Sequence, residues 1–302
     1  MSKKTLVITL SVVALIILLT AYLGISLYIA NTLSTSQNLQ FSNPLSDVDK
    51  NGKEFTTKTR DNITISGWFF PSMQNKKCAI VLVPGFGQNR VDPSYGGIPI
   101  AQDLLKNGYG VAMFDPRGSG YSQKTRLGFG SKEGEDTLAV ISYLSSKGIQ
   151  PQNTGIIANS LGAITTLQFL KDYKKVGAIV VDSPAEAIQP FVERGLRERN
   201  IPSFLFPGIF FTSKYFLNID IPSVRPIDKI KEDTSRKLLF LHGENDTLIT
   251  PSNSLRLQQL SNPASKRVVF QNAGHVQTYK TNPQLYRDTV YSFFKDELPG
   301  CN

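Results

Sequence analysis

The chain has 302 residues, 40% of them hydrophobic and 19% charged, with 33 Lys and Arg against 24 Asp and Glu. This composition is typical of a folded globular protein and excludes a disordered or fibrous chain. Two cysteines, in no metal-like spacing, exclude a disulfide framework, and two histidines exclude a histidine-rich metal site. Chemistry that depends on histidine therefore has two candidates, His242 and His275.

An uncharged apolar segment lies close to the N-terminus, over residues 6–30. As a helix it would span roughly 37 Å, enough to cross a hydrocarbon core of about 30 Å. Lys3 and Lys4 precede it, and the next basic residue is Lys50. The positive-inside rule then predicts a single-pass cell-membrane protein with its N-terminus in the cytoplasm and the rest outside. A cleaved signal peptide is the alternative, but its apolar region is shorter, about 7–15 residues, so we favour an uncleaved anchor over residues 1–30.

Residues 31–50 are polar and predict a tether to a domain over residues 51–302. Without the first 30 residues the chain keeps 31 basic and 24 acidic residues, a net charge of +7. Such a charge suits an anionic lipid or cell-wall surface. The basic residues are scattered and form no basic–aromatic module, so we expect no nucleic-acid partner.

From residue 54 onward, β-type runs alternate with helical ones. Residues 54–59 and 63–70 alternate apolar and polar side chains, which predicts an antiparallel pair at a sheet edge. Helical spacing follows over residues 133–147 and 283–298. This alternation predicts an α/β fold, with a mostly parallel eight-stranded sheet and helices on both faces. The remaining strands are continuously apolar runs, as in strands buried on both faces, at 78–83, 109–114, 154–158, 176–181, 237–242 and 267–270.

One connection, between Val181 and Lys237, is more than 50 residues long, far beyond an ordinary crossover. Residues 183–236 are rich in aromatic and proline side chains, which favours an inserted cap over a disordered loop. The cap also carries three arginines, Arg194, Arg197 and Arg199, which face either an anionic head group or, more simply, solvent.

The segment TGIIANSLGA, residues 154–163, combines the end of a strand with the start of a helix. Ser160 lies at the turn between them, as the serine of a nucleophile elbow does. Ala158 and Gly162 are the small residues that such a turn needs two positions before and after the serine. A serine that only caps the helix is the alternative interpretation.

Two further candidates follow in chain order. Asp246 comes just after the seventh predicted strand, and His275 just after the eighth. Ser, Asp and then His is the order in which an α/β-hydrolase sheet brings a triad together, beyond the carboxyl ends of its strands. We therefore predict a triad of Ser160, Asp246 and His275. Glu244 is a rival acid, and His242, which ends a buried strand, is interpreted as a structural core residue.

A glycine-rich turn follows the third predicted strand at the same sheet edge. The backbone N–H groups of Phe86 and Leu161 are the predicted oxyanion hole, with Gly85 and Gly87 permitting the turn. A plain tight turn is the alternative.

Five segments together resemble bacterial membrane-anchored α/β hydrolases, a broad group that includes serine aminopeptidase-like and monoacylglycerol-lipase-like enzymes. They are PGFGQNR (84–90), FDPRGSGYS (114–122), ANSLGA (158–163), LHGEND (241–246) and AGH (273–275). The resemblance implies the α/β-hydrolase fold and a structural role for residues 115–122 in shaping the loop after the fourth strand. The chain departs from the group at Pro84, where a His often precedes the oxyanion glycine, and at Ala158, which replaces the first elbow glycine.

These residues predict an extracytoplasmic serine hydrolase that acts on a small acyl substrate without metal or cofactor. Carboxylic esters are favoured, because an apolar pocket, with Phe210 or Phe211 in its wall, would lie near the membrane. A peptidase or acyltransferase would use the same triad. A catalytically inactive, membrane-tethered binding module is the alternative from a different class.

Overall fold

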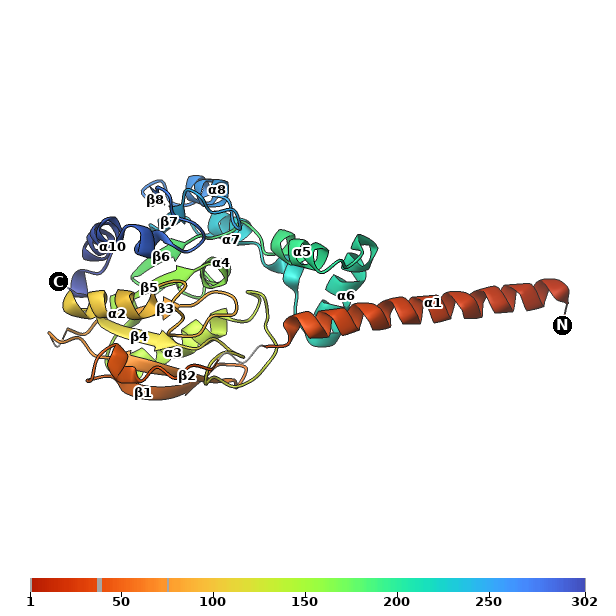
Figure 1. The fold of residues 1–302 in the computed structure, drawn as a ribbon, viewed down its shortest axis with the longest axis horizontal. Coiled ribbons are helices and arrows are strands. Elements are labelled where there is room, and N and C mark those ends of the chain that lie inside the picture. The colour runs from red at the N-terminus through yellow and green to blue at the C-terminus, as the bar shows by residue number, and fades with distance from the viewer. Residues whose placement is uncertain (1, 37–39, 75, 302) are drawn as a thin grey trace.

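The computed structural model describes residues 2–36, 40–74 and 76–301, with one eight-stranded sheet at its centre (Figure 1). The strand order is β1-β2-β4-β3-β5-β6-β7-β8, antiparallel between β1 and β2 and between β2 and β4, and parallel elsewhere. The mostly parallel sheet is thus confirmed. Its strands are β1 Lys53–Lys58, β2 Thr64–Phe70, β3 Ala79–Val83, β4 Gly110–Phe114, β5 Thr154–Asn159, β6 Ala178–Asp182, β7 Leu239–Gly243 and β8 Lys266–Phe270.

Helices cover both faces of the sheet, as the sequence predicts. Every residue in β3, β5 and β6 is buried, because helices cover both sides of these central strands. One face packs against α2 (Gly97–Lys106) and α10 (Pro283–Glu297). The other face packs against α3 (Gly134–Ser146), α4 (Leu161–Gln168), α7 (Pro226–Glu232) and α8 (Ser252–Leu260). The short helix α9 (Thr278–Thr281) lies between β8 and α10 in the chain.

The loop after β4 is held by a buried ion pair. The Asp115 carboxylate accepts hydrogen bonds from the backbone N–H of Arg90 at 2.9 Å and from its guanidinium at 2.7 Å. It also accepts one from the N–H of Tyr121 at 2.8 Å. Gly120, at φ 48°, lies so close that a Cβ would collide with this carboxylate. The pair joins the loop after β4 to the turn that follows β3.

The connection between β6 and β7 forms a cap with an apolar core of its own. Its helices are α5 (Gln189–Glu198) and α6 (Phe206–Leu217), which lie to one side of the sheet in Figure 1. Val192, Leu196 and Ile209 are buried in this core. At the end of the connection, α7 returns to the sheet.

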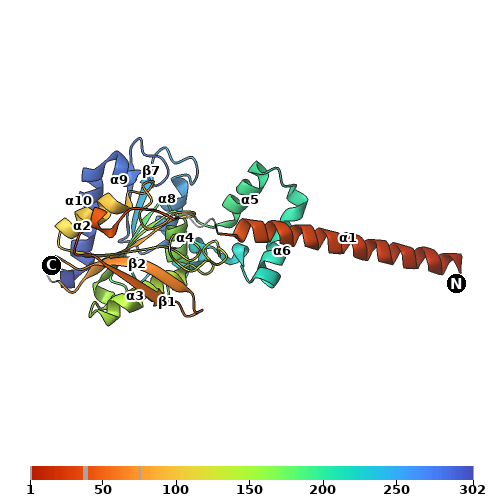
Figure 2. The same cartoon turned by 60° about the horizontal axis from the view of Figure 1, so that its bottom comes forward.

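The N-terminal helix α1 spans Lys3–Ser34. The helix is long and apolar enough to cross a membrane, and signal sequences share this length and composition. Figures 1 and 2 both show its C-terminal third against α6, while the remainder projects free of the domain.

Residues 31–50, the predicted tether, contact the domain at several points, and residues 37–39 of this segment lie outside the described residues. Residues 31–34 continue the helix. Phe41 packs edge-on against Trp68, with ring centroids 5.6 Å apart, and its carbonyl accepts the Tyr121 hydroxyl at 2.8 Å. Val48 is buried in the main core. These apolar side chains attach the segment to the domain because they cover the sheet beside β2.

Candidate active site

Ser160 lies in a strained turn between β5 and α4. Its backbone has φ 49° and ψ −117°, a combination that is rare for a residue with a side chain and is typical of functional turns. A Cβ on Gly162 would collide with the carbonyl oxygens of Val83 and Pro84. The strand–turn–helix geometry predicted for this segment therefore exists, and it needs a glycine two positions after the serine.

The structure brings the three predicted triad residues into contact. The Nε2 atom of His275 lies 2.8 Å from the Ser160 Oγ, and its Nδ1 atom lies 2.7 Å from the Asp246 Oδ2. The serine, acid and histidine follow β5, β7 and β8, which are parallel strands. With Nδ1–H donating to Asp246, the free lone pair of Nε2 can accept the serine proton.

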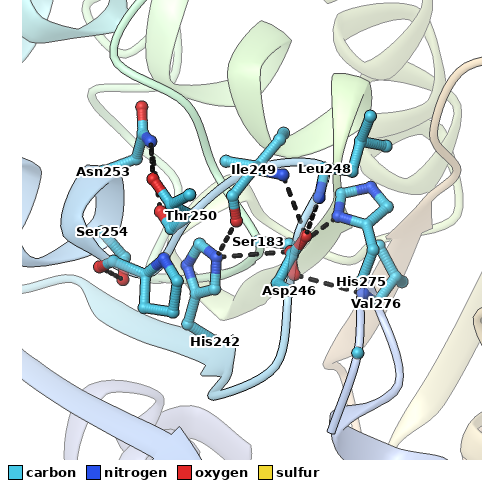
Figure 3. A network of polar contacts seen from close by, with 12 residues as sticks. Ser183, His242, Asp246, Leu248, Ile249, Thr250, Asn253, Ser254, His275 and Val276 are labelled. Carbon is cyan, nitrogen blue, oxygen red and sulfur yellow. Dashed lines mark hydrogen bonds and ion pairs between the residues drawn. The ribbon is translucent and has the colours of Figure 1, made fainter.

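Asp246 is almost fully buried, at 3% exposed, yet it has several hydrogen-bond donors. The N–H groups of Leu248 and Ile249 donate to its carboxylate at 3.0 and 2.9 Å. His242 and His275 lie on opposite sides of it (Figure 3). Burial by itself would raise the pKa of Asp246, but the hydrogen bonds from the two histidines outweigh it and hold the pKa well below its usual value.

The rival acid and the second histidine have different partners. Glu244 is exposed and accepts the N–H of Asn272 at 3.2 Å, a hydrogen bond that leads away from His275. His242 is fully buried, as a core residue should be. Its Nε2 atom lies 2.7 Å from the Ile249 carbonyl oxygen and 3.3 Å from the Asp246 Oδ2. We did not predict this contact between His242 and Asp246 from the sequence. The signal for it was a histidine four positions before the acid.

A second buried carboxylate, Asp182 at the end of β6, was also missed. Burial raises its pKa, and its side chain accepts hydrogen bonds from Ser183 and Thr278. Ser183 in turn accepts the N–H of Val276 at 3.2 Å. This chain of contacts positions the loop that carries His275. The sequence signal for Asp182 was its place at the end of an apolar run, in the segment VVDS, at the same sheet edge as the other candidates.

The two predicted oxyanion donors line the same cavity as Ser160. Leu161 is the first residue of α4, so its N–H has no acceptor within the helix. Phe86 follows Gly85, where an added Cβ would lie 3.1 Å from the Ser160 Cβ. The Gly85 N–H donates to the Gln88 side chain at 2.5 Å, which holds the turn in place.

Comparison with known proteins identifies this architecture. Residues 79–210 match the model of a family described as the alpha/beta hydrolase fold. The chain has the α/β-hydrolase fold. Among solved structures it is similar to the esterase Pf2001 of Pyrococcus furiosus, with a TM-score of 0.72 and 22% identity over 88% of this chain and 98% of that one. The esterase domain of a Rhodothermus marinus protein gives a TM-score of 0.61 and 17% identity over 82% of this chain and 99% of that one.

Two similar sequences are uncharacterized proteins. YqkD of Bacillus subtilis is 29% identical over 197 residues, which make up 63% of each chain, so the match spans less than two thirds of YqkD. YfhR of Escherichia coli is 23% identical over 253 residues, or 82% of each chain.

In this α/β-hydrolase fold a cavity of about 580 Å³ adjoins Ser160. Phe191, Val192 and Leu196 of the cap line it, together with residues of α1. The expectation for Phe210 and Phe211 was wrong. Neither side chain lines the cavity, because Phe210 is buried in the cap core and Phe211 is 47% exposed on the cap surface.

The three cap arginines have separate surroundings. Arg194 donates to the Leu248 carbonyl at 2.9 Å and so ties the cap to the loop that carries Asp246. Arg197 pairs with Glu193 at 3.3 Å, as expected for a solvated helix face. Arg199 lines the cavity.

Within the described part of the chain, no group of three or more His, Cys, Asp and Glu side chains is placed to hold a metal ion.

Proposed function

We propose that this chain is a serine hydrolase that cleaves carboxylic esters through an acyl-enzyme intermediate. The observation that carries this proposal is the continuous contact from Ser160 through His275 to Asp246 in an α/β-hydrolase fold. The triad would require no metal or cofactor for acyl transfer.

In the proposed reaction, Nε2 of His275 accepts the proton of the Ser160 hydroxyl as Oγ bonds to the carbonyl carbon of the ester. The N–H groups of Phe86 and Leu161 donate to the oxygen that becomes negatively charged. His275 then gives the proton to the departing alkoxide, which leaves an acyl group on Ser160. A water molecule then bonds to the acyl carbon as His275 takes its proton, and His275 returns that proton to the Ser160 Oγ as the bond between Oγ and the acyl carbon breaks and the acid leaves. Asp246 stays ionised and stabilises the protonated imidazole.

The apolar cavity wall favours an acyl chain over a peptide as the bound group. The esterase names of two similar structures support the same choice. A peptidase or acyltransferase would use the same triad, and an inactive binding module would have no need for it.

We propose further that α1 anchors the enzyme in the cell membrane as a single span. Lys3 and Lys4 favour a cytoplasmic N-terminus, which leaves the catalytic domain outside the cytoplasm.

A fluorophosphonate probe tests the nucleophile. The wild-type chain and a Ser146→Ala variant, changed at an exposed serine of α3, should be labelled, whereas Ser160→Ala should not. Labelling that survives in Ser160→Ala, or is absent from the wild type, would contradict the proposal.

A series of p-nitrophenyl esters compared with aminoacyl-nitroanilides then tests the substrate. Faster cleavage of the anilides would favour the peptidase.

A further inference from the structure

The helix α1 is longer than a membrane requires. Its 32 residues span about 48 Å, against a hydrocarbon core of about 30 Å. The described residues up to Ala21 are all exposed, and residues 3–21 would span about 28 Å, close to that core. Burial begins at Tyr22 and Ser26. The helix therefore divides into a free part, residues 3–21, and a docked part, residues 22–34.

The docked part packs closely on the cap. Ser26 and Ala30 are at most 4% exposed, and a Cβ on Gly208 of α6 would collide with Ser26. Small residues on both helices permit this approach. The Tyr22 hydroxyl donates to the Phe204 carbonyl at 3.0 Å and accepts the Gly208 N–H at 3.0 Å. These two bonds fix the helix at the point where its burial begins.

The docked part is also fixed to the catalytic domain at its other end. The N–H of Leu127 donates to the Ser34 carbonyl at 2.8 Å. The Arg126 guanidinium donates to the Asn31 side chain at 2.9 Å. Because both ends have partners outside the helix, residues 22–34 are part of the folded domain.

This docked part forms one wall of the cavity beside Ser160. Tyr28, Ile29, Thr32 and Leu33 of α1 line the cavity, together with residues of the turn after β3, of α4 and of the cap. Removal of α1 would therefore open the cavity to solvent.

An exposed aromatic surface lies beside the same helix. Phe204, Phe211, Tyr215 and Phe216 are 47–68% exposed. They belong to α6 and to the turn Ser203–Leu205 before it. Lys214, the one charged residue of α6, pairs with Asp220 at 2.8 Å. Exposed aromatic side chains next to a membrane span are typical of the membrane–water interface.

We infer that α1, α6 and the cavity form one lipid-facing unit, in which the aromatic surface lies in the membrane interface and the α1 wall guides the acyl chain of a membrane lipid to Ser160. This inference rests on the proposed ester hydrolysis. It assigns acyl-chain selection to Tyr28, Ile29, Thr32 and Leu33, and it makes a bilayer lipid the substrate.

Fluorescence quenching tests the position of α6 without relying on activity. The chain has a single tryptophan, Trp68, which is 3% exposed in the core. In vesicles that contain brominated lipids, full-length Tyr215→Trp should be quenched strongly. The matched control is Leu255→Trp, at a residue 42% exposed on α8, which should be quenched no more than the wild type. Equal quenching of the two variants would overturn the inference.

Activity in vesicles tests the acyl wall. The full-length enzyme is given soluble p-nitrophenyl butyrate and, in the same vesicles, a phospholipid with a fluorogenic long acyl chain. We expect Thr32→Trp, which narrows the cavity, to lower lipid hydrolysis relative to butyrate hydrolysis by about tenfold or more. Ile25→Trp, at an exposed residue of α1 that does not line the cavity, should leave this ratio unchanged.

The outcomes separate the two proposals. Hydrolysis of butyrate without hydrolysis of the lipid, or an unchanged ratio in Thr32→Trp, would overturn the inference and leave the serine hydrolase in place. Hydrolysis of neither ester would refute the serine hydrolase itself, and quenching of Tyr215→Trp would still decide whether the aromatic surface lies in the bilayer.

Discussion

Asp246 is a deeply buried carboxylate that several hydrogen bonds hold in place. Two backbone N–H groups and two histidines surround it. The backbone groups fix the orientation of the carboxylate, so its remaining lone pairs point at His275 and His242. In the proposed triad His242 is a positioning residue, since it contacts the acid at 3.3 Å.

Replacement of the acid tests its role in the proposed triad. Asp246→Asn should lower kcat for an ester by about 10⁴-fold, because an amide at this position favours the wrong tautomer of His275. Glu244→Gln is the matched control and should retain activity, since Glu244 contacts Asn272. Full activity in Asp246→Asn together with loss in Glu244→Gln would transfer the role to Glu244.

The lowered pKa of Asp246 predicts an acid-dependent loss of stability. In the unfolded chain this carboxyl titrates at about pH 4, whereas in the folded chain it stays ionised to lower pH. Its contribution to stability is therefore fully present above about pH 4 and is lost as the pH falls toward the folded-state pKa. Urea unfolding in detergent at pH 6 and pH 3 should show a steeper loss for the wild type than for Asp246→Asn. Equal losses would contradict this expectation.

Among the structural elements, the loop after β4 depends on one buried ion pair. Arg90 and Asp115 are at most 1% exposed, and the pair connects this loop to the turn that carries Phe86. The resemblance to known hydrolases implied a structural role for the loop, and these contacts supply the physical reason.

Breaking that ion pair should be costly. Asp115→Ala leaves the Arg90 guanidinium buried without its carboxylate, so the free energy of unfolding should fall by about 3–5 kcal/mol. Asp172→Ala removes a half-exposed partner of Arg60 and should cost no more than about 1 kcal/mol. Denaturant unfolding of both variants measures the difference. Similar costs for the two would show that the buried pair has no special role.

At the scale of the whole molecule, the proposed topology is open to a direct test. External protease added to intact cells should degrade the catalytic domain, because Lys3 and Lys4 favour a cytoplasmic N-terminus. A cytoplasmic marker protein should survive the same treatment. If the domain resists protease until the cells are opened, the orientation is reversed.

The order and type of the main elements were predictable from the sequence. Each predicted strand forms within two residues of its expected bounds, from 54–59, observed as Lys53–Lys58, to 267–270, observed as Lys266–Phe270. Apolar runs and turn residues are local patterns, so the strands that they predict do not depend on where the segment lies in the fold. The same holds for the elbow around Ser160, whose strand, turn and helix are consecutive in the chain.

The tertiary structure alone decided how distant segments meet. Asp246 rather than Glu244 faces His275, because the loop after β7 directs two acids, two positions apart, to different partners. The docking of α1 on α6 depends on contacts between residues about 180 positions apart. Small residues such as Ser26 and Ala30 would permit close packing against many different helices. The sequence therefore determined that residues 6–30 form an apolar helix, and only the tertiary packing determined which helix it contacts.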